Sequence, residues 1–135
     1  MRAERIVVAG AAEGPVVVLD EPLSFWGGLD PETGTVIDAH HPQVGCNLRG
    51  AVVVMPAGRG LSSASSVITE AARLGTAPAA LVMRRADDIL ATGAIVADEL
   101  YGRPVPLFEV DDEVYAACAA ATSLVLTPAG EVRIR

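Results

Sequence analysis

The stretch "AVVVMPAGRGLSSASSVITEAARLGTAPAALVM", residues 51–83, contains a complete strand–helix–strand unit. Residues 51–56 form a continuous apolar run of strand length, which is typical of a strand covered on both faces. Residues 64–74 place apolar side chains at helical spacing, and residues 79–83 form a second buried strand. This order predicts a right-handed crossover between two parallel strands, and therefore a mixed α/β fold.

Small residues mark both ends of the central helix. Ser62 or Ser63 is predicted to cap its N-terminus, because a serine hydroxyl accepts hydrogen bonds from the unpaired N–H groups of a first turn. Gly75 is predicted to end the helix in the left-handed conformation that glycine adopts without strain.

The flanking sequence predicts about eight short strands and three helices in all, within one domain that spans residues 1–135. A short helix is predicted to begin at Asp87 and to give way to a turn at Gly93. Pro104 and Pro106 favour an edge position or a strand start for the segment they introduce. Further strands are expected at residues 6–8 and 16–19, joined by a Gly-rich turn, and at 35–38 and 104–110. Residues 123–127 and 131–135 are expected to form a hairpin, with 131–135 as an edge strand. The third helix is expected at residues 111–121.

Composition excludes several classes of function. The formal charge is −7 and no basic cluster is present, so nucleic-acid binding is not expected. No apolar run approaches membrane-spanning length and no signal peptide is evident, which favours a cytoplasmic protein with reduced thiols. Cys46 and Cys118 form no C-x-x-C pair and have no histidine at a metal-ligand spacing, so no metal or cofactor is expected to be bound by this chain alone.

The turn "GRGLSSASS", residues 58–66, is the best candidate site in the chain. A Gly-rich loop that enters a helix exposes unpaired N–H groups at the positive end of the helix dipole. Arg59 adds a forked donor for carboxylate or phosphate, and the serines add hydroxyls. The alternative is that the serines are only caps and the glycines serve backbone geometry. The stretch is neither a Walker A loop nor a Rossmann fingerprint.

Other chemistry-bearing residues have simpler interpretations. His40 and His41 could act as general acid or base, but a surface loop whose polar groups satisfy turns explains them better. Asp87 and Asp88 could form a carboxylate pair, although an acidic helix start accounts for them. Phe25 and Trp26 could wall a site or meet a partner, and a core anchor is the more ordinary role.

Several segments together resemble the small subunits, or swivel domains, of the aconitase X family. They are "SFWGGLDPETG" (24–34), "HHP" (40–42), "AVVVMPAGRG" (51–60) with its following serines, "GTAPAALV" (75–82) and "GAIVA" (93–97). The resemblance implies a swivelling β/β/α domain, similar to the fourth domain of aconitase. It also implies a hydro-lyase in which a large subunit carries an iron–sulfur cluster or iron and completes the active site. The substrates it implies are small anionic hydroxy compounds: cis-3-hydroxy-L-proline, taken as the leading one, or mevalonate 5-phosphate.

The resemblance also implies roles for the loop. The family's catalytic base is a serine that most often follows the second glycine of G-[RK]-G directly, and here Leu61 holds that position. Ser62 is therefore expected to take the proton, with Ser63 the weaker candidate. Gly58, Arg59 and Gly60 are expected to bind the substrate carboxylate.

Two rival functions remain open. Leu61 cannot move a proton, so the chain could be a non-catalytic partner or regulatory subunit. A free-standing domain that binds small anions without a large subunit is the third possibility.

Overall fold

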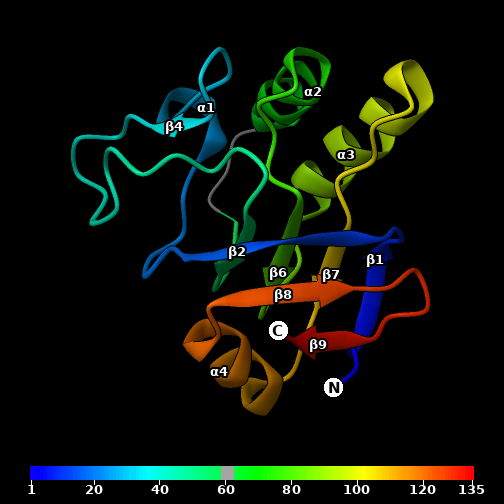
Figure 1. The fold of residues 1–135 in the computed structure, drawn as a ribbon. Helices are drawn as coiled ribbons and strands as arrows, with labels where there is room; N and C mark the ends of the chain where they lie inside the picture. Colours follow the sequence, from blue (N-terminus) through cyan, green and yellow to red (C-terminus); the bar gives the residue numbers. More distant parts are fainter. Residues whose placement is uncertain (59–62) are drawn as a thin grey trace.

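A computed structural model describes residues 1–58 and 63–135 of the chain. Within those residues it has nine strands and four helices (Figure 1). The strands are β1 (Arg5–Val8), β2 (Ala12–Val18), β3 (Leu29–Asp30), β4 (Thr35–Val36), β5 (Val52–Met55), β6 (Ala80–Met83), β7 (Leu107–Glu109), β8 (Ser123–Leu126) and β9 (Val132–Ile134). The helices are α1 (Phe25–Gly28), α2 (Ala64–Leu74), α3 (Asp88–Tyr101) and α4 (Asp112–Ala120).

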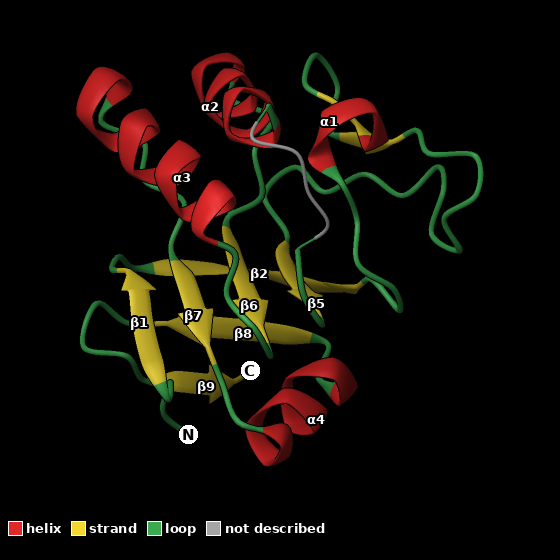
Figure 2. Ribbon diagram, turned by 180° about the vertical axis from the view of Figure 1, so that it is seen from behind, coloured by secondary structure: helices red, strands yellow, loops and turns green. Residues whose placement is uncertain are grey.

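Seven strands form one curled sheet in the order β1-β7-β6-β5-β2-β8-β9. The central strands β2, β5, β6 and β7 are parallel, and the outer pairings are antiparallel. The two ends of this order meet, because Arg2 bridges to Glu131 and the N–H of Ala3 donates to the carbonyl of Gly130 at 2.8 Å. The sheet thus curls back on itself, with β8 and β9 crossing behind β1, β7 and β6 (Figure 2).

Both faces of the central strands are covered, as the apolar run at 51–56 predicted. In β5, Val53 and Met55 pack in the cluster shared with α2 and α3, whereas Val52 and Val54 pack in the cluster shared with α4 and β8. Helices α2 and α3 lie side by side on one face of the central strands, and α4 lies on the other face (Figure 2). The parallel pairing of β5 with β6 across α2 confirms the predicted crossover.

The ends of α2 match the prediction only in part. Gly75 has φ 77° and ends the helix by donating its N–H to the carbonyls of Ala71 and Ala72, as expected. Ser63 precedes the first helical residue but is itself in helical conformation, and its side chain makes no capping hydrogen bond. The prediction of a Ser63 side-chain cap is therefore wrong, and Ser62 lies outside the described residues.

The turn expected at Gly93 is also wrong, because α3 runs without interruption from Asp88 to Tyr101. A Cβ at Gly93 would lie 2.5 Å from the carbonyl oxygen of Ser65 on α2. Glycine inside a helix costs about 1 kcal/mol relative to alanine, and here its lack of a side chain allows close helix packing instead.

The structure decides the position and pairing of several predicted strands. The segment after Pro104 and Pro106 is not an edge strand, because β7 lies between β1 and β6; the strand-start alternative is correct. The strands β1 and β2 follow each other in sequence but are not paired. The strand expected at 35–38 is shortened to β4, which pairs with β3 in a separate small sheet. The predicted hairpin of β8 and β9 is confirmed, with β9 last in the strand order.

No helix within the described ranges is long and apolar enough to cross a membrane.

Candidate functional site

The candidate site lies at the carboxyl ends of the parallel strands. There β2 leads toward α1, β5 toward α2 and β6 toward α3. In open α/β sheets this edge is where ligands bind, because loops and helix N-termini converge there. Of the residues predicted to form the site, Gly58 and Ser63 are described, whereas Arg59, Gly60 and Ser62, together with Leu61, lie outside the described residues.

Gly58 brings two of these connections into contact. It forms an isolated parallel bridge with Leu23, in the segment that follows β2. A Cβ on Gly58 would overlap the carboxylate of Asp87, which lies in the connection from β6 to α3. Glycine is required here for close approach of a side chain, not for a left-handed backbone.

Asp87 has the structural role that its position predicts. Its Oδ1 accepts a hydrogen bond from the N–H of Ile89 at 2.8 Å, which caps the first turn of α3. An open cavity of about 450 Å³ lies against this cap. It is lined by Ala57, Gly58, Arg85, Ala86, Asp87, Asp88 and Ile89.

Two hydrogen bonds hold the segment before α3. The N–H of Arg85 donates to the carbonyl of Pro56 at 3.0 Å. The N–H of Ala86 donates to Oε2 of Glu109 at 2.8 Å, and Arg5 donates to the same oxygen at 3.4 Å. The bond from Ala86, followed by that from Arg5, lowers the pKa of the Glu109 carboxyl. Sequence reasoning missed both Arg85 and Glu109; a single acidic residue at the end of an apolar strand was the one available signal for Glu109.

The serines at the start of α2 are not equivalent. Ser63 is exposed, and its carbonyl accepts hydrogen bonds from the N–H of Ser66 at 3.2 Å and from the Ser66 hydroxyl at 2.7 Å. Ser66 therefore closes the first turn of the helix, whereas the Ser63 side chain makes no capping bond. Ser63 is thus exposed at the start of the helix, and its role toward a ligand stays a prediction.

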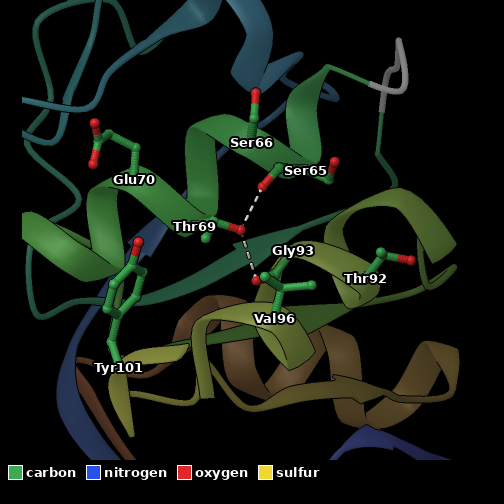
Figure 3. A pocket seen from close by; sticks show the side chains of 8 residues that line it. All are labelled: Ser65, Ser66, Thr69, Glu70, Thr92, Gly93, Val96 and Tyr101. Carbon is green, nitrogen blue, oxygen red and sulfur yellow. Dashed lines mark hydrogen bonds between the residues drawn. The ribbon is translucent and has the colours of Figure 1, made fainter. Parts of the chain in front are cut away.

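A second groove, of about 410 Å³, runs between α2 and α3 (Figure 3). It is lined by Ser65, Ser66, Thr69, Glu70, Thr92, Gly93, Val96 and Tyr101. The Thr69 hydroxyl, at its centre, is already engaged with the carbonyls of Ser65 and Gly93. Glu70 pairs with Arg73, which lowers the pKa of that carboxyl. The bond from Thr69 to Gly93 joins the two helices, whereas the pair of Glu70 with Arg73 lies within α2.

The two histidines separate in the structure. His41 is buried, with 5% of its surface exposed; its Nε2 lies 3.0 Å from the carbonyl of Glu21 and its Nδ1 accepts the N–H of Gln43 at 3.0 Å. Nε2 must therefore carry the proton and donate it to Glu21, which leaves neither nitrogen for proton transfer. His40 is exposed, and its N–H donates to Asp38. The loop interpretation holds, with the addition that His41 anchors the loop from inside.

Phe25 and Trp26 also have different roles. Phe25 is fully buried in the core under α2, as expected of a core anchor. Trp26 is 53% exposed on α1, and α1 packs against α2. The core interpretation is therefore wrong for Trp26, because neighbouring residues of one turn point in opposite directions.

The described residues do not fit an iron or iron–sulfur site. Cys118 is buried under the sheet, and burial raises the pKa of its thiol to about 11, whereas a metal ligand must be a thiolate. Cys46, half-buried, lies in a different segment. Across residues 1–58 and 63–135 no three potential ligands cluster.

Comparison with known proteins agrees with this architecture. Residues 1–134 match the family described as the aconitase X swivel domain. The crystal structure of Thermococcus kodakaraensis aconitase X in its holo-form superposes with a TM-score of 0.84 at 36% identity, covering 99% of this chain and 96% of that chain. The swivel-domain fold expected from the sequence is thereby confirmed.

Named relatives fall into two groups. The cis-3-hydroxy-L-proline dehydratase of Pseudomonas aeruginosa is 50% identical over 103 residues, which are 76% of this chain and 18% of that protein. That of Hypocrea jecorina is 46% identical over 100 residues, or 17% of its length, so this chain spans under a fifth of both relatives. The phosphomevalonate dehydratase small subunit of Methanothrix thermoacetophila is 37% identical over 130 residues and is covered over 95% of its length.

Proposed function

The chain belongs to the aconitase X swivel-domain family, and we propose that it is the small subunit of a dehydratase that removes water from a small anionic hydroxy acid. The observation that carries this proposal is the junction of Gly58 with Asp87. Because Gly58 has no side chain, the Asp87 carboxylate lies directly against it. The segments that follow β5 and β6 therefore meet at this contact. The loop between Gly58 and Ser63 begins at that junction and ends at the start of an 11-residue helix.

In this proposal the loop supplies binding and proton transfer. Arg59 binds the substrate carboxylate with the backbone of Gly58 and Gly60, because a guanidinium fork matches two carboxylate oxygens. Ser62 removes the proton from the adjacent carbon, with Ser63 as the weaker candidate. The N-terminus of α2 favours the negative charge that develops on the serine oxygen.

We propose cis-3-hydroxy-L-proline as the substrate, with mevalonate 5-phosphate as the alternative. Relatives bearing either name reach 50% identity, so identity does not separate the two.

The partner in this proposal is a large subunit that also holds any iron or iron–sulfur cluster. The exposed indole of Trp26, next to α2, supports a contact surface on this side of the domain. The two cis-3-hydroxy-L-proline dehydratases are single long chains, and this chain spans under a fifth of each. The rest of such a chain corresponds, in this proposal, to the separate large subunit.

The test is co-expression with the candidate large subunit and assay of water loss from both substrates. Ser62→Ala is expected to lower kcat at least a hundredfold, in line with loss of a catalytic base. The matched control is Ser123→Ala on β8, which removes a hydroxyl that donates to the carbonyl of Gly14 on β2 and is expected to leave kcat unchanged. An unchanged rate in Ser62→Ala would rule out that residue, and the same assay of Ser63→Ala then decides between the two serines.

The second candidate function is a non-catalytic subunit, and Leu61 favours it. It predicts a stable complex with the large subunit that dehydrates neither compound. Restoring a hydroxyl with Leu61→Ser would then create activity, whereas under the first proposal it adds little to the rate.

A further inference from the structure

We propose that His41 is a pH-sensitive latch. As a neutral imidazole it holds the loop of residues 38–44 against the segment that follows β2, and on protonation it releases that loop. Of the two histidines of the chain it is the buried one, with 5% of its surface exposed. The latch concerns the conformation of this chain alone, so it does not depend on the proposed function.

The two ends of this loop are fixed without its histidines. The N–H of Ile37 donates to the carbonyl of Gly28 at 2.8 Å. The N–H of Gly45 donates to the carbonyl of Val36, on β4, also at 2.8 Å. Residues 38–44 therefore form a loop whose ends meet at β4, and its position against the rest of the domain depends on contacts made from within the loop.

His41 and Gln43 make such contacts with residues 20 and 21. Nε2 of His41 donates to the carbonyl of Glu21 at 3.0 Å. The side chain of Gln43 bonds Asp20 twice: its Nε2 donates to Oδ2 at 2.7 Å, and its Oε1 accepts the N–H of Asp20 at 2.9 Å. Nδ1 of His41 accepts the N–H of Gln43 at 3.0 Å, which orients Gln43 toward Asp20. One neutral imidazole thus supports these contacts, directly or through Gln43.

The bond from Gln43 to Nδ1 requires a neutral ring. A neutral imidazole has one donor and one acceptor nitrogen, whereas a protonated ring has two donors. On protonation, Nδ1–H would face the N–H of Gln43, and a charge would enter a site that water hardly reaches. Asp38 closes a similar turn by accepting the N–H of His40 at 2.9 Å, but a carboxylate is still an acceptor at about pH 5.5. His41 is therefore the proton-sensitive member of the two turns.

The ionisable groups around the latch offer the protonated ring no bonded partner. Asp20 and Glu21 lie on the segment after β2, and Asp38 and the exposed His40 lie on the loop; no described carboxylate bonds to the His41 ring. Asp20 and Glu21 are exposed, so their charges are screened. On α4, burial and then the charge of Asp20 raise the pKa of Tyr115, so its phenol stays neutral near pH 7. Acid therefore favours the open loop.

Amide hydrogen exchange of the full chain, followed by NMR at about pH 7.5 and about pH 5.5, tests the latch on both sides of the ordinary imidazole range. The protection factor corrects for the intrinsic effect of pH and reports local opening. We expect the protection factors of Gln43 and Asp20 to fall in parallel by about tenfold, because an imidazole in the open loop titrates near about pH 6.5. The N–H groups of Ile37 and Gly45 are internal controls and should keep their protection.

Two substitutions identify the titrating group. His41→Asn keeps an oxygen that accepts the N–H of Gln43 in an Asx turn but takes up no proton in this range. Its protection factor for Gln43 should therefore be the same at both pH values. The matched control is His40→Asn, at the exposed histidine next in the chain, which should retain the full fall in protection.

Protection of Gln43 that is absent, or equal at the two pH values, would overturn the latch in the wild-type chain. A fall that persists in His41→Asn, or that disappears in His40→Asn, would do the same. Should His41→Asn not fold, ¹⁵N spectra of the wild-type imidazole decide instead. They should show the proton on Nε2 at the higher pH, and ring protonation should follow the same pH curve as the loss of Gln43 protection. A ring that is protonated while this protection stays intact would refute the latch.

Discussion

The hydroxyl of Thr69 on α2 lies 2.9 Å from the carbonyl oxygen of Gly93 on α3, and 2.8 Å from the carbonyl of Ser65 one turn back on its own helix (Figure 3). The hydroxyl of one α2 residue is thus shared between carbonyl oxygens of both helices. The start of α2, which borders the candidate site, is positioned by its packing against α3.

Gly93→Ala should destabilise the protein. The new methyl group would lie 2.5 Å from the carbonyl of Ser65, and overpacking of this kind costs about 1–3 kcal/mol. The free energy of unfolding in urea measures the effect. Glu99→Ala, on the exposed side of the same helix, is the control and should change stability by less than about 0.5 kcal/mol. Equal midpoints for the two variants would contradict the close packing.

Gly58→Ala and Asp87→Ala should be non-additive. Asp87→Ala loses the cap of α3, at about 1 kcal/mol, and Gly58→Ala forces the Asp87 carboxylate to move. In the double variant the carboxylate is gone, so the Gly58 substitution should cost less than it does alone. A double-mutant cycle of unfolding free energies gives this coupling, and a coupling of zero would show that the two residues do not touch.

Glu109 should make stability depend on pH in the acid range. Because Ala86 and Arg5 lower its carboxyl pKa in the folded state, its contribution is present above the unfolded pKa and is lost as the pH falls through the folded value. We expect wild-type protein to lose stability more steeply than Glu109→Gln between about pH 5 and pH 3, near the ordinary range of glutamate. Urea midpoints across this range are the measurement. Parallel curves would show that the contact carries no pH-dependent stability.

The two thiols should differ in reactivity. Burial raises the pKa of the Cys118 thiol to about 11, so at pH 8 it stays protonated and covered. Cys46 is half-exposed. Brief iodoacetamide treatment of folded protein should therefore label Cys46 alone, as read by mass spectrometry of peptides. Addition of urea should expose both, and labelling of Cys118 in the native protein at a similar rate would contradict its burial.

Trp26 should report assembly with the large subunit. It is the single tryptophan of the chain and is half-exposed, so 5-fluorotryptophan labelling gives one ¹⁹F resonance. On addition of unlabelled large subunit this resonance is expected to shift and to lose its dependence on H₂O versus D₂O. Tyr115, on α4 at the opposite end, serves as the control after 3-fluorotyrosine labelling and should keep its shift. An unchanged Trp26 signal in a complex that has formed would place the interface elsewhere.

Local patterns were sufficient to predict much of the framework. The apolar run of β5, the periodicity of α2 and Gly75 at its end each depend on a few neighbouring residues, and each prediction was confirmed. The turn predicted at Gly93, and the edge alternative for the strand after Pro106, were wrong for the opposite reason. Gly93 resembles a turn residue until α2 lies against it, and a proline before a strand does not reveal which neighbours the strand will have.

The residues of the candidate site also fall into those that the sequence indicated and those that only tertiary contacts revealed. Sequence and family resemblance singled out Gly58, Arg59, Gly60, Ser62 and Ser63, and their roles remain predictions. Arg85 and Glu109 were missed because neither belongs to a motif; each gains a place near the site only through a contact from another strand or loop.

The sequence by itself determined the α/β class, the central crossover and the family, because these follow from hydrophobic periodicity and from residues close together along the chain. Only the tertiary structure decided that Gly58 lies against Asp87 and that Glu109 accepts a hydrogen bond from Ala86. It also decided that both ring nitrogens of His41 are hydrogen-bonded to the backbone. Gly58 and Asp87, for example, are 29 positions apart in the sequence. No local pattern predicts such a contact, because it forms only after the sheet has curled and the helices have packed.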